Sequence, residues 1–130
     1  KGVLKDYKEA VKWYTKAANQ GYASAQYNLG WMYAKGYGVL KDYKEAVKWY
    51  TKAANQGVAK VQSNLGWMYE RGIGVIKDKV QAHMWYNLAS ISGKSKYATQ
   101  NRDIIEKEMS RAEIQEANRL AREWLRKHQK

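Results

Sequence analysis

Three residue types are missing from this chain of 130 residues: cysteine, proline and phenylalanine. Without cysteine the chain forms no disulfide and no thiolate metal site, so the redox compartment stays open. Without proline, no helix is interrupted by the loss of a backbone N–H group. Without phenylalanine, the aromatic volume comes from six Trp and eleven Tyr, whose polar groups suit half-buried positions and binding surfaces.

The sequence also lacks an apolar run of the roughly 18 residues that a membrane-spanning helix needs. It shows no signal-peptide pattern, and it begins at Lys1, inside a repeat, and not at a methionine. We therefore expect a soluble fragment of a longer protein. Its compartment, cytoplasmic or exported, cannot be distinguished from this sequence.

Acidic residues are few relative to basic ones. The chain carries 24 Lys and Arg against 12 Asp and Glu, a formal net charge of +12. Such a balance favours acidic partners, which include acidic proteins, nucleic acid and anionic membranes. The alternative is a well-solvated outer face that recognises nothing.

The main positive feature is an internal repeat. Residues 2–21 and 38–57 are the same twenty residues, offset by 36 positions. The same offset relates tryptophans in two sets: Trp13, Trp49 and Trp85, and Trp31 with Trp67. A fixed period of this length indicates stacked helical units, each in contact only with its neighbours, and an extended surface suited to binding.

Each period predicts two helices. The first spans about 6–19, 42–55 and 78–91, each with an acidic N-cap and Glu or Gln three residues later, as in a capping box: Asp6 with Glu9, Asp42 with Glu45, and Asp78 with Gln81. A glycine is expected to stop each of them, at Gly21, Gly57 and Gly93. The second helix spans about 23–35 and 59–71. Gly30 and Gly66 inside it predict close contact with another helix, and the glycines of 36–39 and 72–75 predict tight turns with positive φ.

The pattern from Ala25 to Gly57 is Ala-x₃-Leu-Gly-x₂-Tyr-x₂-Gly-x-Gly-Val-x₂-Asp-x₃-Ala-x₂-Trp-Tyr-x₂-Ala-Ala-x₂-Gly. It resembles the Sel1-like repeat, a longer relative of the 34-residue tetratricopeptide repeat, and the resemblance covers residues 2–93. It implies an all-α fold, a right-handed α/α solenoid of helix-turn-helix repeats with a C-terminal capping helix, in a protein of bacterial type. We expect one domain over 1–130, with repeat units at about 6–41, 42–77 and 78–109, the last degenerate, and the cap at about 110–128.

After Gly93 the repeat decays, because Asn101 and Arg102 replace its Leu-Gly pair. A helix is expected over 94–109, followed by a capping box at Ser110 and Glu113 and a last amphipathic helix to about Lys127. A polar outer face on that helix is what closes a solenoid. The N-terminal repeat has no such cover. Trp13, Trp49 and Trp85 are expected in the core and Trp124 in the cap, with Trp13 and Tyr14 less well covered than their equivalents.

In tetratricopeptide arrays the Leu-Gly-x₂-Tyr helix lines a concave groove. The resemblance therefore implies that Ala34 and the following residues line the groove: Ser24, Tyr27, Asn28, Trp31, Lys35, Lys60, Ser63, Asn64, Trp67, Glu70 and Arg71. Exposed aromatics interleaved with cations are typical of interaction hot spots. The alternatives are that Asn28 and Asn64 tie neighbouring helices together, and that Trp31 and Trp67 cover the groove floor.

The function expected from these features is that of a protein–protein interaction adaptor or scaffold, which binds a protein or peptide segment in the groove. The net positive charge makes an acidic segment one option. The alternative is a basic module that binds nucleic acid or an anionic surface through an exposed stripe of lysines: Lys8, Lys12, Lys16, Lys44, Lys48 and Lys52. No catalytic motif is present, so an enzyme, a cofactor and a metal site are not expected. His83 and His128 have no ligand cluster at suitable spacing. The oligomeric state stays open, with end-to-end stacking through the N-terminal repeat as one option.

Overall fold

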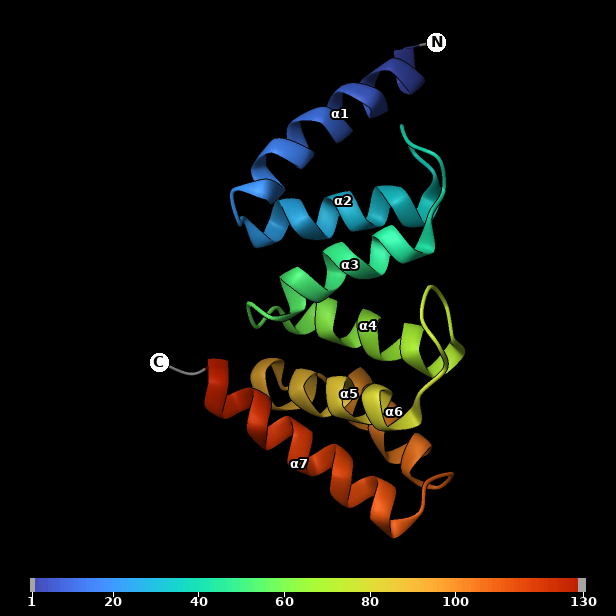
Figure 1. Ribbon diagram of the computed structural model, residues 1–130, viewed down its shortest axis with the longest axis vertical. Helices are drawn as coiled ribbons and strands as arrows, with labels where there is room; N and C mark the ends of the chain where they lie inside the picture. The colour runs from blue at the N-terminus through green and yellow to red at the C-terminus, as the bar shows by residue number, and fades with distance from the viewer. Residues whose placement is uncertain (1, 129–130) are drawn as a thin grey trace.

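The computed structural model describes residues 2–128, with side chains from Asp6 onward, and the regular secondary structure of this part of the chain consists of helices alone. The prediction of an all-α fold is thereby confirmed. The helices follow one another down the long axis of the molecule (Figure 1). Their bounds are α1 (Gly2–Asn19), α2 (Ala23–Lys35), α3 (Tyr43–Ala54), α4 (Ala59–Arg71), α5 (Lys79–Gly93), α6 (Lys96–Glu106) and α7 (Arg111–His128).

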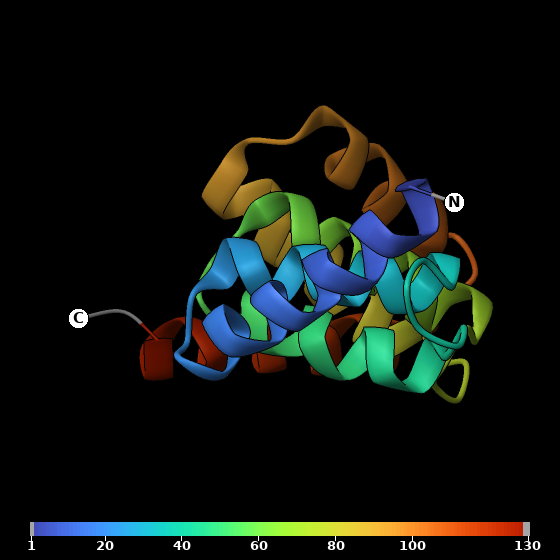
Figure 2. The same ribbon diagram turned by 90° about the horizontal axis from the view of Figure 1, so that it is seen from above.

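Packing is mainly between neighbours in sequence, as in a stack of repeats. From α1 to α6 each helix packs against the next, and α7 packs against α5. Seen along the stack, α6 and α7 lie on opposite sides of the molecule (Figure 2). No helix of the described residues is long and apolar enough to cross a membrane.

We call α1, α3 and α5 the outer helices and α2 and α4 the inner helices. The predicted N-caps are confirmed at two of the three outer helices, α3 and α5. The Asp42 carboxylate accepts a hydrogen bond from the Glu45 backbone N–H at 3.1 Å, and Asp78 does the same for Gln81. The other half of the capping box is different, because the Asp42 N–H donates to the Tyr33 carbonyl at 2.9 Å. The backbone of the preceding helix thus satisfies a group that the Glu side chain was expected to satisfy.

The predicted cap at Asp6 is wrong, because α1 begins at Gly2 and Asp6 lies inside it. The same residues form a loop in the second copy, where Gly36 and Gly38 adopt positive φ and the Tyr33 carbonyl holds Asp42. The described chain holds no helix ahead of α1 that could offer this acceptor. Identical residues therefore continue the helix in one copy and form a loop in the other.

The glycines inside α2 and α4 allow close packing, as predicted. A Cβ on Gly30 would lie 2.8 Å from a ring carbon of Tyr50, and one on Gly66 would lie 2.9 Å from a ring carbon of Tyr86. The carbonyls of Ala46 and Ala82 would lie 3.2 Å away. Each inner helix therefore rests on the tyrosine ring of the outer helix that follows it.

The three equivalent tryptophans do not share one environment. Trp49 and Trp85 are buried, but Trp13 is 59% exposed, so its expected place in the core is wrong. Trp49 packs against Ala18, Ala25 and Leu29, which belong to the unit before its own. The described chain contains no unit ahead of Trp13 that could pack against it. This agrees with the expectation that Trp13 is less well covered than its equivalents.

The end of α5 differs from the expectation as well. Gly93 is the last residue of the helix, and Lys94 takes the left-handed conformation at φ 51°. A Cβ at Gly93 would clash with the Ala59 side chain. This glycine therefore brings α5 close to the start of α4, and the left-handed residue that ends the helix is Lys94.

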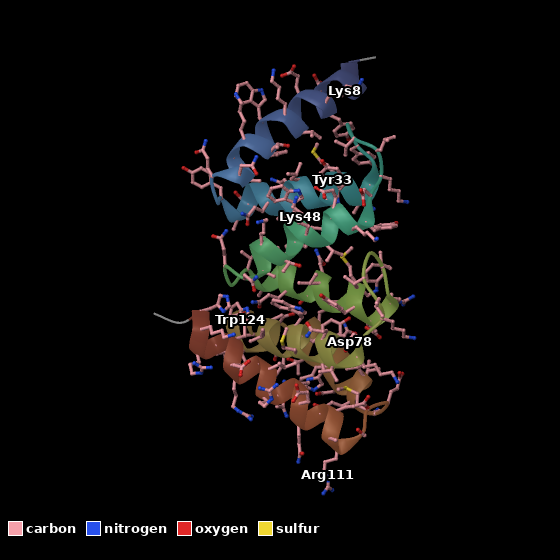
Figure 3. The ribbon with its side chains drawn as sticks, in the orientation of Figure 1. Lys8, Tyr33, Lys48, Asp78, Arg111 and Trp124 are labelled. Carbon is pink, nitrogen blue, oxygen red and sulfur yellow. The ribbon has the colours of Figure 1, made fainter. Side chains whose placement is uncertain are left out.

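The C-terminal helix is capped and amphipathic, as predicted. The Ser110 N–H donates to the Glu113 carboxylate at 2.8 Å, and the Glu113 N–H donates to the Ser110 hydroxyl at 3.1 Å. Trp124 packs edge-on against Trp85 at 6.3 Å between ring centroids, where α7 meets α5, while Arg111 extends into solvent (Figure 3). The Trp124 indole N–H also donates to Asn55. The short helix α6, expected over 94–109, is capped by Ser95, which the sequence reading overlooked.

Candidate functional site

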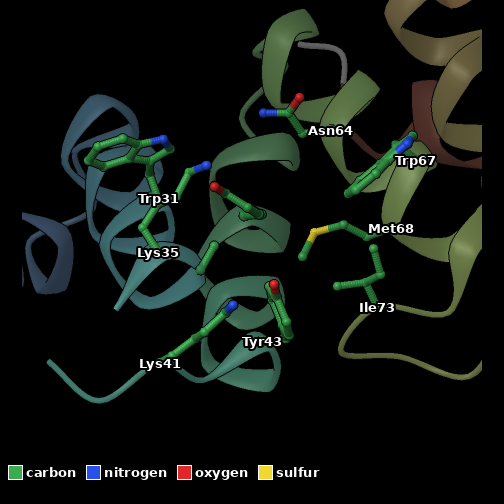
Figure 4. A pocket seen from close by; sticks show the side chains of 10 residues that line it. Trp31, Lys35, Lys41, Tyr43, Asn64, Trp67, Met68 and Ile73 are labelled. Carbon is green, nitrogen blue, oxygen red and sulfur yellow. The ribbon is translucent and has the colours of Figure 1, made fainter. Parts of the chain in front are cut away.

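A pocket of about 310 Å³ opens where α2, α3 and α4 meet, and we call it the α2–α4 pocket. Trp31 on α2 and Trp67 on α4 stand on its two sides (Figure 4). The full lining is Trp31, Ala34, Lys35, Lys41, Tyr43, Tyr50, Asn64, Trp67, Met68 and Ile73. Two tryptophans one repeat apart therefore share one cavity.

Half of that lining was expected from the sequence. The α2–α4 pocket brings together Trp31, Ala34, Lys35, Asn64 and Trp67 from the two inner helices. The other half consists of Lys41 and Ile73 from the loops, Tyr43 and Tyr50 from the outer helix α3, and Met68 from α4, which the sequence did not place in the groove. The loop residues of this half could have been predicted from the repeat, since the Gly-x-Gly loop must pass beside the end of the inner helix.

Cations cover several aromatic rings near the pocket. The Lys60 ammonium lies 4.7 Å from the centre of the Tyr27 ring, and the Arg71 guanidinium carbon lies 5.6 Å from the centre of the Trp67 ring. Such cation–π contacts contribute about 0.5–1 kcal/mol at exposed sites. Tyr27 itself tilts against Tyr50 at 5.8 Å. These side chains hold each other in place beside the α2–α4 pocket.

Trp31 also borders a second cavity, between α1 and α2. This cavity has a volume of about 300 Å³. It is lined by Asp6, Tyr7, Ala10, Tyr14, Asn28, Trp31 and Met32. Tyr37 packs edge-on against Trp31 at 5.1 Å and stacks on Tyr7 at 4.7 Å. The Trp31 ring thus stands between two cavities that follow one another along the stack.

Two of the expected groove residues have structural roles. Ser63 is buried, and within the described residues its hydroxyl has no hydrogen-bond partner. Glu70 accepts a 2.7 Å hydrogen bond from the hydroxyl of Tyr86, a side chain with no exposed surface. The remaining groove residues, from Ser24 to Arg71, keep side chains that are at least partly accessible. Within the described residues the side-chain amides of Asn28 and Asn64 form no hydrogen bond. The alternative that they tie neighbouring helices together therefore has no support.

His83 has a carboxylate partner that sequence spacing does not show. Its ring is fully buried, and Nε2 lies 2.7 Å from the Glu106 carboxylate, which α6 brings back onto α5. Within the described residues Nδ1 has no partner. The same part of the chain contains no group of three side chains that would hold a metal ion. His83 is thus a packed residue of the third outer helix, and it links α5 to α6.

The lysine stripe lies outside both cavities. All six of its side chains, on α1 and α3, are exposed. Lys48 pairs with Glu45 at 3.6 Å, and both Lys48 and Lys52 lie over the Trp49 ring. Part of the stripe therefore covers the buried tryptophan of its own helix.

Alkaline pH is expected to destabilise the protein through two buried tyrosines. Burial, followed by the hydrogen bond to Glu70, raises the pKa of Tyr86 above its usual 10.0, and burial also raises the pKa of Tyr50. Stability from a raised pKa is complete below pH 10 and is lost as the pH rises from there toward the folded-state pKa, by up to about 1.4 kcal/mol per pH unit for each phenol. Urea unfolding between about pH 8 and pH 11 measures this decline. Tyr86→Phe should decline less steeply, and an unchanged slope would contradict the assignment to Tyr86.

Comparison with known proteins agrees with the repeat pattern. The Sel1 repeat model matches residues 1–22, 23–58 and 59–94. The chain is 40% identical to c5321, described as a protective antigen of uropathogenic Escherichia coli strains with an SLR fold, with a TM-score of 0.88 over 93% of this chain and 26% of that one. A Sel1 repeat protein from Oxalobacter formigenes is 46% identical, with a TM-score of 0.67 over 69% of this chain and 37% of that one. No curated protein matches the chain.

Proposed function

Because the chain belongs to the Sel1 repeat family, we propose that it is a protein-interaction adaptor whose inner helices bind a segment of a partner protein. The observation that supports this most directly is the α2–α4 pocket, in which Trp31 and Trp67 stand on opposite sides. Tryptophan is enriched among the few residues that contribute most of the affinity of an interface. The proposed contact surface is the set of groove residues expected from the sequence, without Ser63 and Glu70 and with Lys41 and Tyr43 added.

The dimensions of the cavity suit a peptide side chain. Its volume of about 310 Å³ lies at the lower end of the range of about 300–1,000 Å³ for small-molecule sites. Its lining offers amine, amide and phenol groups beside indole rings, which serves recognition better than proton transfer between paired groups. A binding role, not a catalytic one, is therefore proposed.

The double substitution Trp31→Ala with Trp67→Ala tests the proposal. Loss of two interface tryptophans is expected to weaken partner capture at least tenfold, since each such anchor contributes 2 kcal/mol or more, roughly, when truncated. The measurement is quantitative pulldown with the whole chain, with far-UV circular dichroism to show that the helices persist.

The matched control is Trp13→Ala with Tyr22→Ala. Both side chains are more exposed than Trp67, at 59% and 61% against 39%, and neither lines the α2–α4 pocket. The control should capture the same partners as the parent. Equal capture by the parent and the Trp31/Trp67 variant would show that binding takes place elsewhere.

A further inference from the structure

The α2–α4 pocket carries a positive charge that nothing in its lining balances. Its charged groups are the ammonium groups of Lys35 and Lys41, and no carboxylate lines it. Within residues 2–128 neither lysine forms an ion pair. The Lys41 ammonium instead lies 5.0 Å from the centre of the Tyr43 ring, at the edge of the cavity. An anionic group placed there would meet two cations and no competing acid.

Apart from Asn64, the rest of the lining is apolar or aromatic. Between the two tryptophans the cavity is bordered by Met68, Ile73 and the ring of Tyr50. Apolar area buried here would contribute about 25 cal/mol per Å². The Asn64 amide adds a donor and an acceptor that no described side chain uses, suited to a peptide group. The pocket therefore suits a bulky apolar side chain that has an acidic neighbour.

Building on the proposed adaptor function, we infer that the occupant is an internal acidic segment of a partner protein. One large apolar side chain of that segment inserts between Trp31 and Trp67. An Asp or Glu within two residues of it pairs with Lys35 and Lys41. Two residues of extended chain span about 7 Å, and both cations line the same cavity as the two tryptophans.

The choice of an internal segment over a chain end follows from Trp31. This ring borders both the α2–α4 pocket and the cavity between α1 and α2. A peptide in extended conformation that crosses Trp31 can occupy both cavities at once, with its acidic side chain in the α2–α4 pocket. A side-chain carboxylate leaves the backbone free to run past the two lysines in either direction, whereas a terminal carboxylate allows only one direction.

The test is selection of random dodecapeptides on the whole chain, with counter-selection on Trp31→Ala/Trp67→Ala. The expected pool depends on both tryptophans and is enriched in Asp or Glu within two residues of a Leu, Ile, Met, Phe or Trp. A parallel library with free carboxyl termini distinguishes a terminal carboxylate from an acidic side chain. A pool that depends on the tryptophans but lacks acidic residues, or that binds only through a free terminus, overturns this inference and leaves the adaptor proposal standing. The absence of any pool that depends on the tryptophans overturns both.

Charge reversal then identifies the two lysines. Lys35→Glu with Lys41→Glu is expected to weaken the best acidic peptide at least tenfold, and a peptide with Lys in place of its acid should bind this variant better than the parent. The matched control is Lys12→Glu with Lys44→Glu, which changes the net charge equally at two exposed positions on the outer helices. Peptide affinity is measured by fluorescence anisotropy. If both variants lose the same affinity for the acidic peptide, the effect comes from the overall charge, and the assignment to Lys35 and Lys41 is overturned.

Discussion

Gly74→Ala is expected to lower the free energy of unfolding by about 2–5 kcal/mol, although it adds a single methyl group. Gly74 has φ +76°, a left-handed conformation that costs an L-residue about 1–2 kcal/mol. A Cβ there would lie 2.5 Å from the Tyr43 carbonyl oxygen and 2.9 Å from Cγ2 of Val47. Because backbone cannot move aside as a side chain can, the loop and α3 must separate, which costs about 1–3 kcal/mol more. Urea unfolding followed by circular dichroism measures the change.

The control for this prediction is Gly57→Ala. Gly57 also has a positive φ, of +89°, but a Cβ there would meet nothing within 4 Å. It should therefore lose only the conformational part, about 1–2 kcal/mol. If the two variants prove equally stable, the contact between Gly74 and Tyr43 does not constrain the loop.

Tyr86→Ala is expected to cost about 3–5 kcal/mol, because it empties a site with no exposed surface. The ring supports Gly66 of α4, and the hydroxyl donates to Glu70 on the same helix. Tyr86→Phe keeps the ring and should cost about 1.5–3 kcal/mol, the usual value of a hydrogen bond to a charged group. Thermal and urea unfolding of both variants separate the two contributions.

A double-mutant cycle with Gly66→Ala tests the ring contact itself. In the parent, the new methyl group meets the Tyr86 ring at 2.9 Å and should destabilise the protein by about 1–3 kcal/mol. In Tyr86→Ala the ring is gone, and alanine is the better helix former by about 1 kcal/mol. We expect a coupling of at least about 1 kcal/mol between the two sites. Additive effects would mean that α4 and α5 do not meet through this pair.

Periodicity accounts for most of what the sequence predicted correctly. The bounds of α2 and α4 match the expectation residue for residue, because glycine and tyrosine recur at one spacing in both copies. The errors come from context that a repeat cannot carry. The exposed Trp13 and the helical Asp6 have the same sequence neighbours as Trp49 and Asp42. They differ in what precedes them, because within the described residues no helix lies ahead of α1, whereas α2 lies ahead of α3.

The candidate site was predictable to a similar extent. Trp31 and Trp67 could be placed together because they lie one repeat apart on equivalent helices. Lys41 could not be placed there, because its position depends on how the loop folds back beside α2. Likewise, the approach of Glu106 to His83 depends on α6, where the repeat pattern has already decayed.

The contact between Gly74 and Tyr43 has a consequence for ligand recognition. Tyr43 and Ile73, the residue before Gly74, both line the α2–α4 pocket. The loop is thus pressed directly against the start of α3, which fixes the end of α4 against α3 on one side of the pocket. A cavity of set width is preorganised, so a ligand does not have to supply the free energy of shaping it. Such a site should bind ligands of one width with little heat-capacity change beyond that of the buried apolar surface, and should reject bulkier ligands instead of adapting to them.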